Sequence, residues 1–331
     1  MTSNARQHEV RIPAEQVNYL IATAARAPSV HNTQPWRFRA TDYAIDLYAD
    51  PKRKLEMDRD GREMVVSCGA ALFGLRLAIR SLGYMPIVES FPEPPRLRLL
   101  ARVRLGAAVP MTPQEYLMLE ALPLRHTHRG PFAGDALPAG LLSGLQHDAL
   151  AEGATLALID RALAYQRLAD IASAADRQQH RDPAVREEIR RWSRDADDLA
   201  RDGVPAVAFP AGTRRVPGRL PQRDFDLGRS LGLLPTEGPP AAATAVLLTT
   251  GDRRADWLRA GQALQRVLTH AATKWVFASL HTQPLENASI RALIRDRLSL
   301  PGAPQMVMQL GVSHTARSTA RRGPDELIEP G

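Results

Sequence analysis

Apolar residues recur at helical spacing in several long stretches of the chain. The run that follows Pro13 predicts a helix that ends before Pro28, because the residue preceding a proline avoids the helical region. A longer apolar run predicts a helix from about Glu63 to Leu82, with Gly83 as its C-terminal cap. Further helices are expected at 112–122, 137–150, through the 160s and 170s, from 183 onwards, at 254–272 and at 289–298.

Shorter stretches alternate apolar and polar residues or are rich in β-branched residues, which is typical of strands. They predict strands at 43–48, 96–104, 154–159, 244–250 and 306–310. Helices and strands are therefore expected to alternate along the whole chain.

Two distant parts of the chain resemble each other. The helical segments that begin at Gly69 and Gly261 share glycine, alanine and leucine at the same offsets. Each is followed by an alternating stretch that ends in Leu-Gly, at 105–106 and at 310–311. The repeated order favours an internal duplication, although two unrelated helices can also match by coincidence.

The segment 203–240 departs from both periodicities and is rich in proline, glycine and arginine. A long segment of this kind in a compact protein is either a lid over an active site or a disordered linker. Phe209, Phe225 and the apolar run at 231–234 are able to pack down, so we favour a lid.

Composition excludes several classes of protein. The chain has 331 residues, enough for about two domains, and a formal net charge of +7 from 43 Lys and Arg against 36 Asp and Glu. The arginines are spread along the chain among acidic residues, which does not indicate a nucleic-acid binder. One cysteine excludes an internal disulfide. No N-terminal apolar run or membrane-spanning stretch is visible, so we expect a cytoplasmic protein with neither nucleic-acid nor membrane partners.

Most candidate chemistry is absent from the sequence. Neither a GxGxxG segment after a strand nor a GxxxxGK[ST] segment is present. His126 and His128 have no further ligand at metal-binding spacing, so no metal site is expected. Ser29 and His31 lack the surroundings of a hydrolytic nucleophile.

Two loops remain as candidates. The loop at 27–38 gathers hydroxyl, amide and backbone donors that can bind a planar polar ring, or it is a polar turn pinned around a buried Trp36. The loop at 125–129 has two arginines four residues apart, which suits an anion such as phosphate, or it is a solvated basic loop. Together the loops indicate a planar organic ligand with a phosphate, held between the two halves.

These loops resemble segments of a known family. The segment APSVHNTQPWRF at 27–38 resembles the APSSxNxQPWxF segment of the flavin-dependent nitroreductases, and RHTHR at 125–129 resembles their RHSxK or RRSxR segment. The segment from Arg321 resembles the closing arginine of the family, which precedes a proline. Nearly end to end, the chain is similar to the fused, internally duplicated Acg-like branch of the family.

The resemblance implies the mixed α+β fold of the nitroreductases, with α/β layers, duplicated as a single-chain pseudo-dimer. The halves would be 1–122 and 123–331, intertwined, with the lid-like insertion at about 203–240. Because each loop occurs once, the resemblance implies one competent FMN site and one degenerate site. The expected partner is a small-molecule substrate, with no nucleic acid and no membrane, and further oligomerisation stays open.

The implied activity is reduction of nitro or quinone-like compounds by NADH or NADPH through bound FMN. The alternative is a protein that stores FMN in an occluded site with little turnover. No catalytic side chain is expected, because FMN carries the chemistry. The family usually has a Gly-Leu-Gly turn where this chain has 274–276, which leaves the shape of the reactive face open. The FMN-binding residues implied are Pro28, Ser29, Val30, Asn32, Gln34, Arg125, His126, Thr127, Arg129, Thr282, Gln283 and Arg322.

Overall fold

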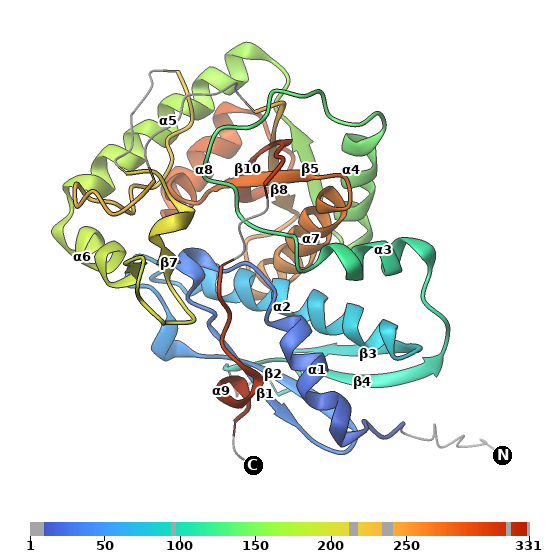
Figure 1. Ribbon diagram of the computed structural model, residues 1–331. Helices are drawn as coiled ribbons and strands as arrows, with labels where there is room; N and C mark the ends of the chain where they lie inside the picture. The colour runs from blue at the N-terminus through green and yellow to red at the C-terminus, as the bar shows by residue number, and fades with distance from the viewer. Residues whose placement is uncertain (1–9, 94–96, 212–217, 234–240, 316–318, 330–331) are drawn as a thin grey trace.

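The computed structural model describes residues 10–93, 97–211, 218–233, 241–315 and 319–329. These form two four-stranded antiparallel sheets with helices between and around them, and a two-stranded parallel sheet of β6 (Ser193–Arg194) and β7 (Val204–Pro205) (Figure 1). The first sheet has the strand order β1-β2-β4-β3 and the second β5-β8-β10-β9. The strands of the first sheet are β1 (Trp36–Ala40), β2 (Ala44–Ala49), β3 (Tyr84–Ser90) and β4 (Leu99–Ala108). Those of the second are β5 (Thr155–Leu158), β8 (Ala243–Thr249), β9 (Val276–His281) and β10 (Ala303–Val312).

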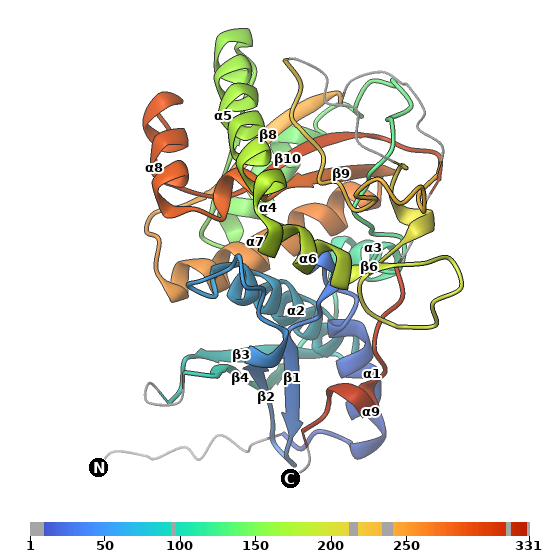
Figure 2. The same ribbon diagram turned by 90° about the vertical axis from the view of Figure 1, so that its left-hand side faces the viewer.

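The helices α2 and α7 lie between the two sheets and pack against each other (Figures 1 and 2). Among the described helices, α2 is long and apolar enough to cross a membrane, but 83% of its most apolar window is buried inside the protein. The helices are α1 (Ala14–Ala24), α2 (Arg62–Ser81), α3 (Pro113–Ala121), α4 (Leu141–Ala151), α5 (Ala162–Arg181), α6 (Pro183–Trp192), α7 (Arg254–Ala272), α8 (Ala288–Arg297) and α9 (Pro324–Leu327).

The crossing of α2 and α7 depends on two glycines. A Cβ atom on Gly69 would lie 2.2 Å from the carbonyl oxygen of Leu258, and one on Gly261 would lie 2.0 Å from the carbonyl oxygen of Val66. The two contacts are reciprocal, because 261 − 69 and 258 − 66 both equal 192. Reciprocal contacts of this kind are the signature of a two-fold interface.

The two parts of the chain share one order of elements. The first runs α1, β1, β2, α2, β3, β4. The second runs α4, β5, β8, α7, β9, β10, with α5, α6 and the 203–240 segment inserted between β5 and β8 and with α8 inserted between β9 and β10. The strand orders correspond position by position. The end of the chain returns to the first sheet, where Ile328 pairs with Phe38 (Figure 2). The division into 1–122 and 123–331 stays a prediction.

The sequence predicted the helices better than the strands. The bounds of α7 coincide with the prediction, and Gly83 ends α2 with a φ of +84°. The prediction missed β1, β3 and β9 and assigned 36–38 to a loop, whereas these residues begin a strand. It also began α4 at 137 instead of Leu141.

Candidate functional site

A cavity lies between the N-terminal part of α2, the ends of β9 and β10, and three loops around residues 28–31, 127–129 and 222–225. The empty space between its walls is about 790 Å³, a figure that includes space open to solvent. Among the residues predicted to bind a ligand, those that line the cavity are Pro28, Ser29, Val30, Thr127, Arg129, Thr282 and Gln283.

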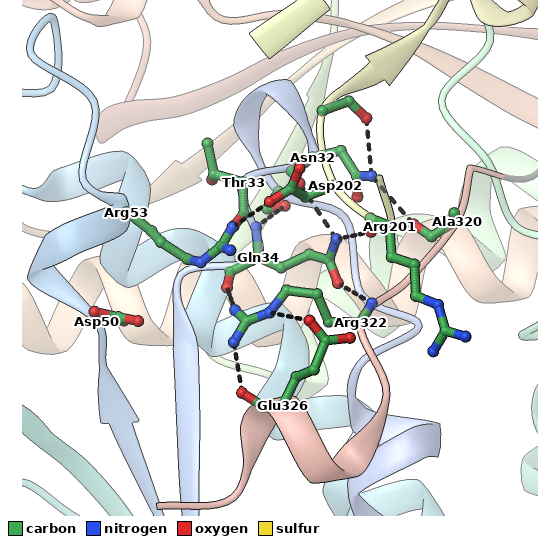
Figure 3. Close-up of polar contacts among 12 residues, drawn as sticks. Asn32, Thr33, Gln34, Asp50, Arg53, Arg201, Asp202, Ala320, Arg322 and Glu326 are labelled. Atoms are coloured by element: carbon green, nitrogen blue, oxygen red, sulfur yellow. Dashed lines mark hydrogen bonds and ion pairs between the residues drawn. The ribbon is translucent and has the colours of Figure 1, made fainter. Parts of the chain in front are cut away.

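The predicted binding residue Asn32 does not line the cavity but fastens its loop to two other segments. Its Nδ2 donates to the carbonyl oxygens of Gly203, at 3.0 Å, and Ala320, at 3.1 Å (Figure 3). The loop is backbone-strained, since His31, Asn32 and Gln34 have φ values of +52°, +55° and +50°. These contacts hold the loop in a conformation that residues other than glycine rarely adopt.

Gln34 and Arg322 form a second joint of the same loop (Figure 3). Gln34 Nε2 donates to the carbonyl oxygen of Arg201 at 2.7 Å, and the backbone amide of Arg322 donates to Gln34 Oε1 at 2.9 Å. The guanidinium of Arg322 donates to the carbonyl oxygens of Gln34, at 3.1 Å, and Glu326, at 2.7 Å. We expected Arg322 to bind phosphate. In the structure its guanidinium instead donates to the backbone oxygens of Gln34 and Glu326.

Next to the cavity, the buried Arg125 and the half-buried Arg129 and Arg321 form a cluster of positive charge. Burial, then Arg129 and Arg26, lower the pKa of Arg125 to about 10, and burial lowers that of Arg129 to about 10. Burial and the neighbouring arginines also lower the pKa of Arg321. None of the ion pairs among the described residues involves these arginines.

Several nitrogen atoms of this cluster have no hydrogen-bond partner in the described part of the chain. Arg125 donates through Nη2 to the carbonyl oxygen of Arg26 at 2.9 Å, but its Nε and Nη1 are unpaired, as is Nε of Arg321. Arg321 Nη2 donates to the carbonyl oxygen of Ala27, beside the cavity-lining Pro28, and its Nη1 donates to Thr319 and to the carbonyl oxygen of Ala320. Buried cations without acidic partners are costly unless an anion binds to them. The cluster therefore suits a phosphate group.

His126, another predicted binding residue, serves as packing. Its ring lies 4.2 Å from that of Phe277, and its Nδ1 lies 3.1 Å from the carbonyl oxygen of Leu124. Burial lowers the pKa of His126 to about 4. His128 stacks on Phe132, and no group of three or more His, Cys, Asp or Glu among the described residues is able to hold a metal ion.

One cavity wall comes from the segment 203–240. In its described parts, 203–211 and 218–233, Phe225 lines the cavity and packs 5.8 Å from Phe209. Phe225 also lies under the guanidinium of Arg129, at 5.4 Å, and 5.3 Å from the ring of His31. Gln222 and Arg223 of this segment line the cavity as well, and its role as a lid stays a prediction; residues 212–217 and 234–240 lie outside the described residues.

The sequence prediction missed two buried titratable residues of the cavity, His31 and Glu63. Neither ring nitrogen of His31 has a partner among the described residues, and burial, followed by Arg223 and Arg129, lowers its pKa. Glu63 is paired with Arg62, yet burial raises the pKa of Glu63 to about 8. His31 lies inside the APSVHNTQPW segment, which was a usable signal, whereas nothing in the helical pattern distinguished Glu63.

Opposite Glu63, Arg223 fastens the 203–240 segment to the turn that follows β9. Its Nη2 pairs with Glu286 and donates to Thr282 Oγ1 at 3.3 Å. Gln283 Nε2 is buried without a partner in the described residues. The cavity thus has an uncompensated basic end and a wall of carboxyl, amide and hydroxyl groups, which together define a site for a polar ligand that bears a phosphate.

Comparison with known proteins gives the family. Residues 7–50 match the model of the nitroreductase family. Two proteins of Mycobacterium tuberculosis named "Putative NAD(P)H nitroreductase" are similar along most of their length: Rv3131 is 32% identical over 90% of this chain and 85% of its own, and acg is 28% identical over 97% of each. The chain belongs to the nitroreductase family.

Solved structures with partial similarity are also nitroreductases. The FMN-bound nitroreductase of Desulfitobacterium hafniense aligns with a TM-score of 0.40 and 13% identity over 67% of this chain and 100% of its own. The FMN-bound nitroreductase of Bacteroides fragilis aligns with a TM-score of 0.38 and 11% identity over 62% and 95%. The family assignment rests on the sequence relatives.

Proposed function

We propose that the protein is an FMN-dependent oxidoreductase that uses NADH or NADPH to reduce nitro or quinone-like compounds. The observation that carries this proposal is the arginine cluster without acidic partners beside the cavity, in a chain of the nitroreductase family. FMN, when bound, supplies the hydride chemistry, and the protein supplies binding, orientation and electrostatics.

The residues present fit FMN because their unpaired polar atoms match its phosphate and its polar ring. Arg125, Arg129 and Arg321 would hold the phosphate, with Arg321 in the role that the resemblance gave to Arg322. Thr127 would bind the ribityl chain. The ring would be held by residues of the 28–30 loop and of the turn after β9, which are Pro28, Ser29, Val30, Thr282 and Gln283.

We also propose that one chain is a pseudo-dimer with a single flavin site. The reciprocal contacts of Gly69 and Gly261 and the matching element orders support it. The residue 192 positions after Arg62 is Arg254, which donates to the carbonyl oxygen of Leu97 and lies 5.9 Å from the centre of the Phe91 ring. Arg254, the counterpart of the cavity-lining Arg62, is thus engaged by residues of the first part of the chain, which supports a single FMN position.

The test is the visible absorbance spectrum of the purified protein, before and after addition of FMN and then of NADPH. We expect a flavin spectrum that bleaches with NADPH and recovers when a quinone or nitroaromatic compound is added. A protein that takes up no FMN refutes the proposal. Bound FMN without turnover of any acceptor refutes the reductase activity and indicates storage.

A further inference from the structure

The last described part of the chain, residues 319–329, forms a strap that lies beside β1 and α1 (Figure 2). At the far end of this C-terminal strap, the side chain of Leu327 is 0% exposed and belongs to the main hydrophobic core. The amide of Glu329 donates to the carbonyl oxygen of Phe38 at 2.7 Å. The far end of the strap is therefore anchored on the first sheet.

The near end of the strap is bonded to the loop at 27–38. Asn32 and Gln34 form the hydrogen bonds to the strap that Figure 3 shows. Arg321 lies between these two anchors in the sequence and donates to the carbonyl oxygen of Ala27 at 3.2 Å. Each of these bonds joins the strap to another segment, so each is lost when the strap opens.

The charge of Arg321 opposes docking of the strap. Burial, and then the other arginines at this place, Arg125, Arg26 and Arg129, lower the pKa of Arg321. The oxygen atoms that accept from its guanidinium are neutral and belong to the strap itself and to the loop at 27–38. The docked strap thus adds a fourth cation to three others, and like charges in a partly buried place repel one another.

We propose that the C-terminal strap is a latch, which an anion at the arginine cluster holds closed. A phosphate there offsets the repulsion that Arg321 meets, so the phosphate binds the protein better when the strap is docked. By linkage, docking of the strap tightens phosphate binding by the same factor. With FMN as the source of the phosphate, the inference rests on the proposed function. Inorganic phosphate supplies the charge without the flavin.

The test is hydrogen exchange of backbone amides in the full-length protein, measured by mass spectrometry. Peptides with the amides of Arg322 and Glu329 report opening of the strap, because both amides are bonded to the loop at 27–38. We expect saturating FMN to slow their exchange about 5- to 150-fold, the usual range of coupling between two sites. Inorganic phosphate should slow it as well. Riboflavin, which lacks the phosphate, and sodium chloride at equal ionic strength should leave it unchanged.

Two variants separate the charge of Arg321 from the other contacts of the strap. Arg321→Met keeps an unbranched side chain without the charge, so FMN should slow exchange of the strap by less than about fivefold, below the usual coupling. The matched control Arg98→Met removes the ion pair of Arg98 with Glu329, at 3.0 Å, and leaves the arginine cluster intact. It should speed exchange slightly with and without ligand and keep the full effect of FMN, because an exposed ion pair contributes little.

A strap that responds to neither FMN nor inorganic phosphate overturns the latch. Equal slowing by riboflavin and FMN overturns it too, as does undiminished slowing by FMN in Arg321→Met. If Arg321→Met does not fold, the comparison of FMN, inorganic phosphate and riboflavin on the wild type decides. A protein that binds no FMN, but whose strap is slowed by inorganic phosphate, refutes the proposed function and supports the latch.

Discussion

Replacement of Arg125 by methionine should stabilise the unloaded protein while it weakens FMN binding. Arg125 is buried, and two of its nitrogen atoms have no partner among the described residues. Burial, Arg129 and Arg26 all disfavour its charge. Methionine keeps an unbranched apolar side chain in the same space and removes that charge. The two effects have opposite signs, which a merely structural arginine would not show.

The magnitudes follow from the structure. Burial, Arg129 and Arg26 lower the pKa of Arg125 to about 10, and at about 1.4 kcal/mol per pKa unit this shift means that its charge costs about 3 kcal/mol in the unloaded protein. The variant also loses the hydrogen bond to the carbonyl oxygen of Arg26, worth about 1 kcal/mol. We therefore expect a net gain of about 1–2 kcal/mol in the free energy of unfolding.

The same substitution removes charged hydrogen bonds to the FMN phosphate, worth about 1.5–3 kcal/mol. The dissociation constant of FMN should rise about 10- to 150-fold. Urea unfolding of the unloaded protein and quenching of FMN fluorescence measure the two effects. Riboflavin, which lacks the phosphate, serves as the control ligand, and its affinity should not change. Arg26→Met, at an exposed neighbour, should alter both quantities only slightly.

An equal loss of affinity for riboflavin and FMN would refute the assignment of Arg125 to the phosphate. A destabilised unloaded variant with unchanged FMN affinity would refute the reasoning about the buried charge, because it would mean that another group compensates Arg125.

Three other substitutions test the fold and the site. Gly69→Ala should destabilise the protein by at least about 3 kcal/mol in urea unfolding, because its Cβ would lie 2.2 Å from the Leu258 carbonyl oxygen. The control Gly130→Ala, whose Cβ would have no heavy atom nearer than 3.7 Å, should change stability by less than about 0.5 kcal/mol. Equal effects of the two substitutions would contradict the close contact of α2 and α7 at Gly69. Gln34→Leu should lower the free energy of unfolding by about 2–4 kcal/mol and weaken FMN binding, because the carbonyl oxygen of Arg201 and the amide of Arg322 lose their partner. An unfolding temperature that is unchanged in calorimetry would contradict this role of Gln34. Because the pKa of Glu63 is raised in the folded state, the folded protein keeps a proton that the unfolded chain has lost between pH 4.5 and about 8. The free energy of unfolding should therefore decline as the pH rises through this range. In Glu63→Gln the decline should be smaller, and an unchanged decline would argue against a raised pKa of Glu63.

The sequence predicts elements whose pattern is local and misses those that the sheet imposes. The helix α7 has a long apolar face and could be bounded to the residue, whereas β3 contains Pro86 and lies at a sheet edge with alternate residues exposed. The strand β9 follows α7 after only three residues, so its apolar run merges with that of the helix. β1 alternates aromatic and basic residues, but it directly follows the polar segment at 27–35, so its first residues were assigned to that loop.

The site shows the same division between local and long-range information. The loops at 27–38 and 125–129 were visible as motifs, and both contribute residues to the cavity. The guanidinium of Arg322 donates to the carbonyl oxygen of Gln34 and that of Arg321 to the carbonyl oxygen of Ala27, both far away in the sequence, so no local pattern could reveal these contacts. The environment of Glu63 is likewise made by groups from four segments, so no local pattern could reveal it.

The features that suit the cavity for a ligand also destabilise the unloaded protein. Arg125 and Arg321 are buried without acidic partners, and the loop at 27–38 holds three residues other than glycine at positive φ, at a cost of about 1–3 kcal/mol each. The first part of the chain supplies this loop and α2, and the second supplies the arginines and the turn after β9. A phosphate-bearing ligand would neutralise the charge and contact both parts at once. Its binding would therefore stabilise the packing of the two parts against each other, which explains why this strain is concentrated where they meet.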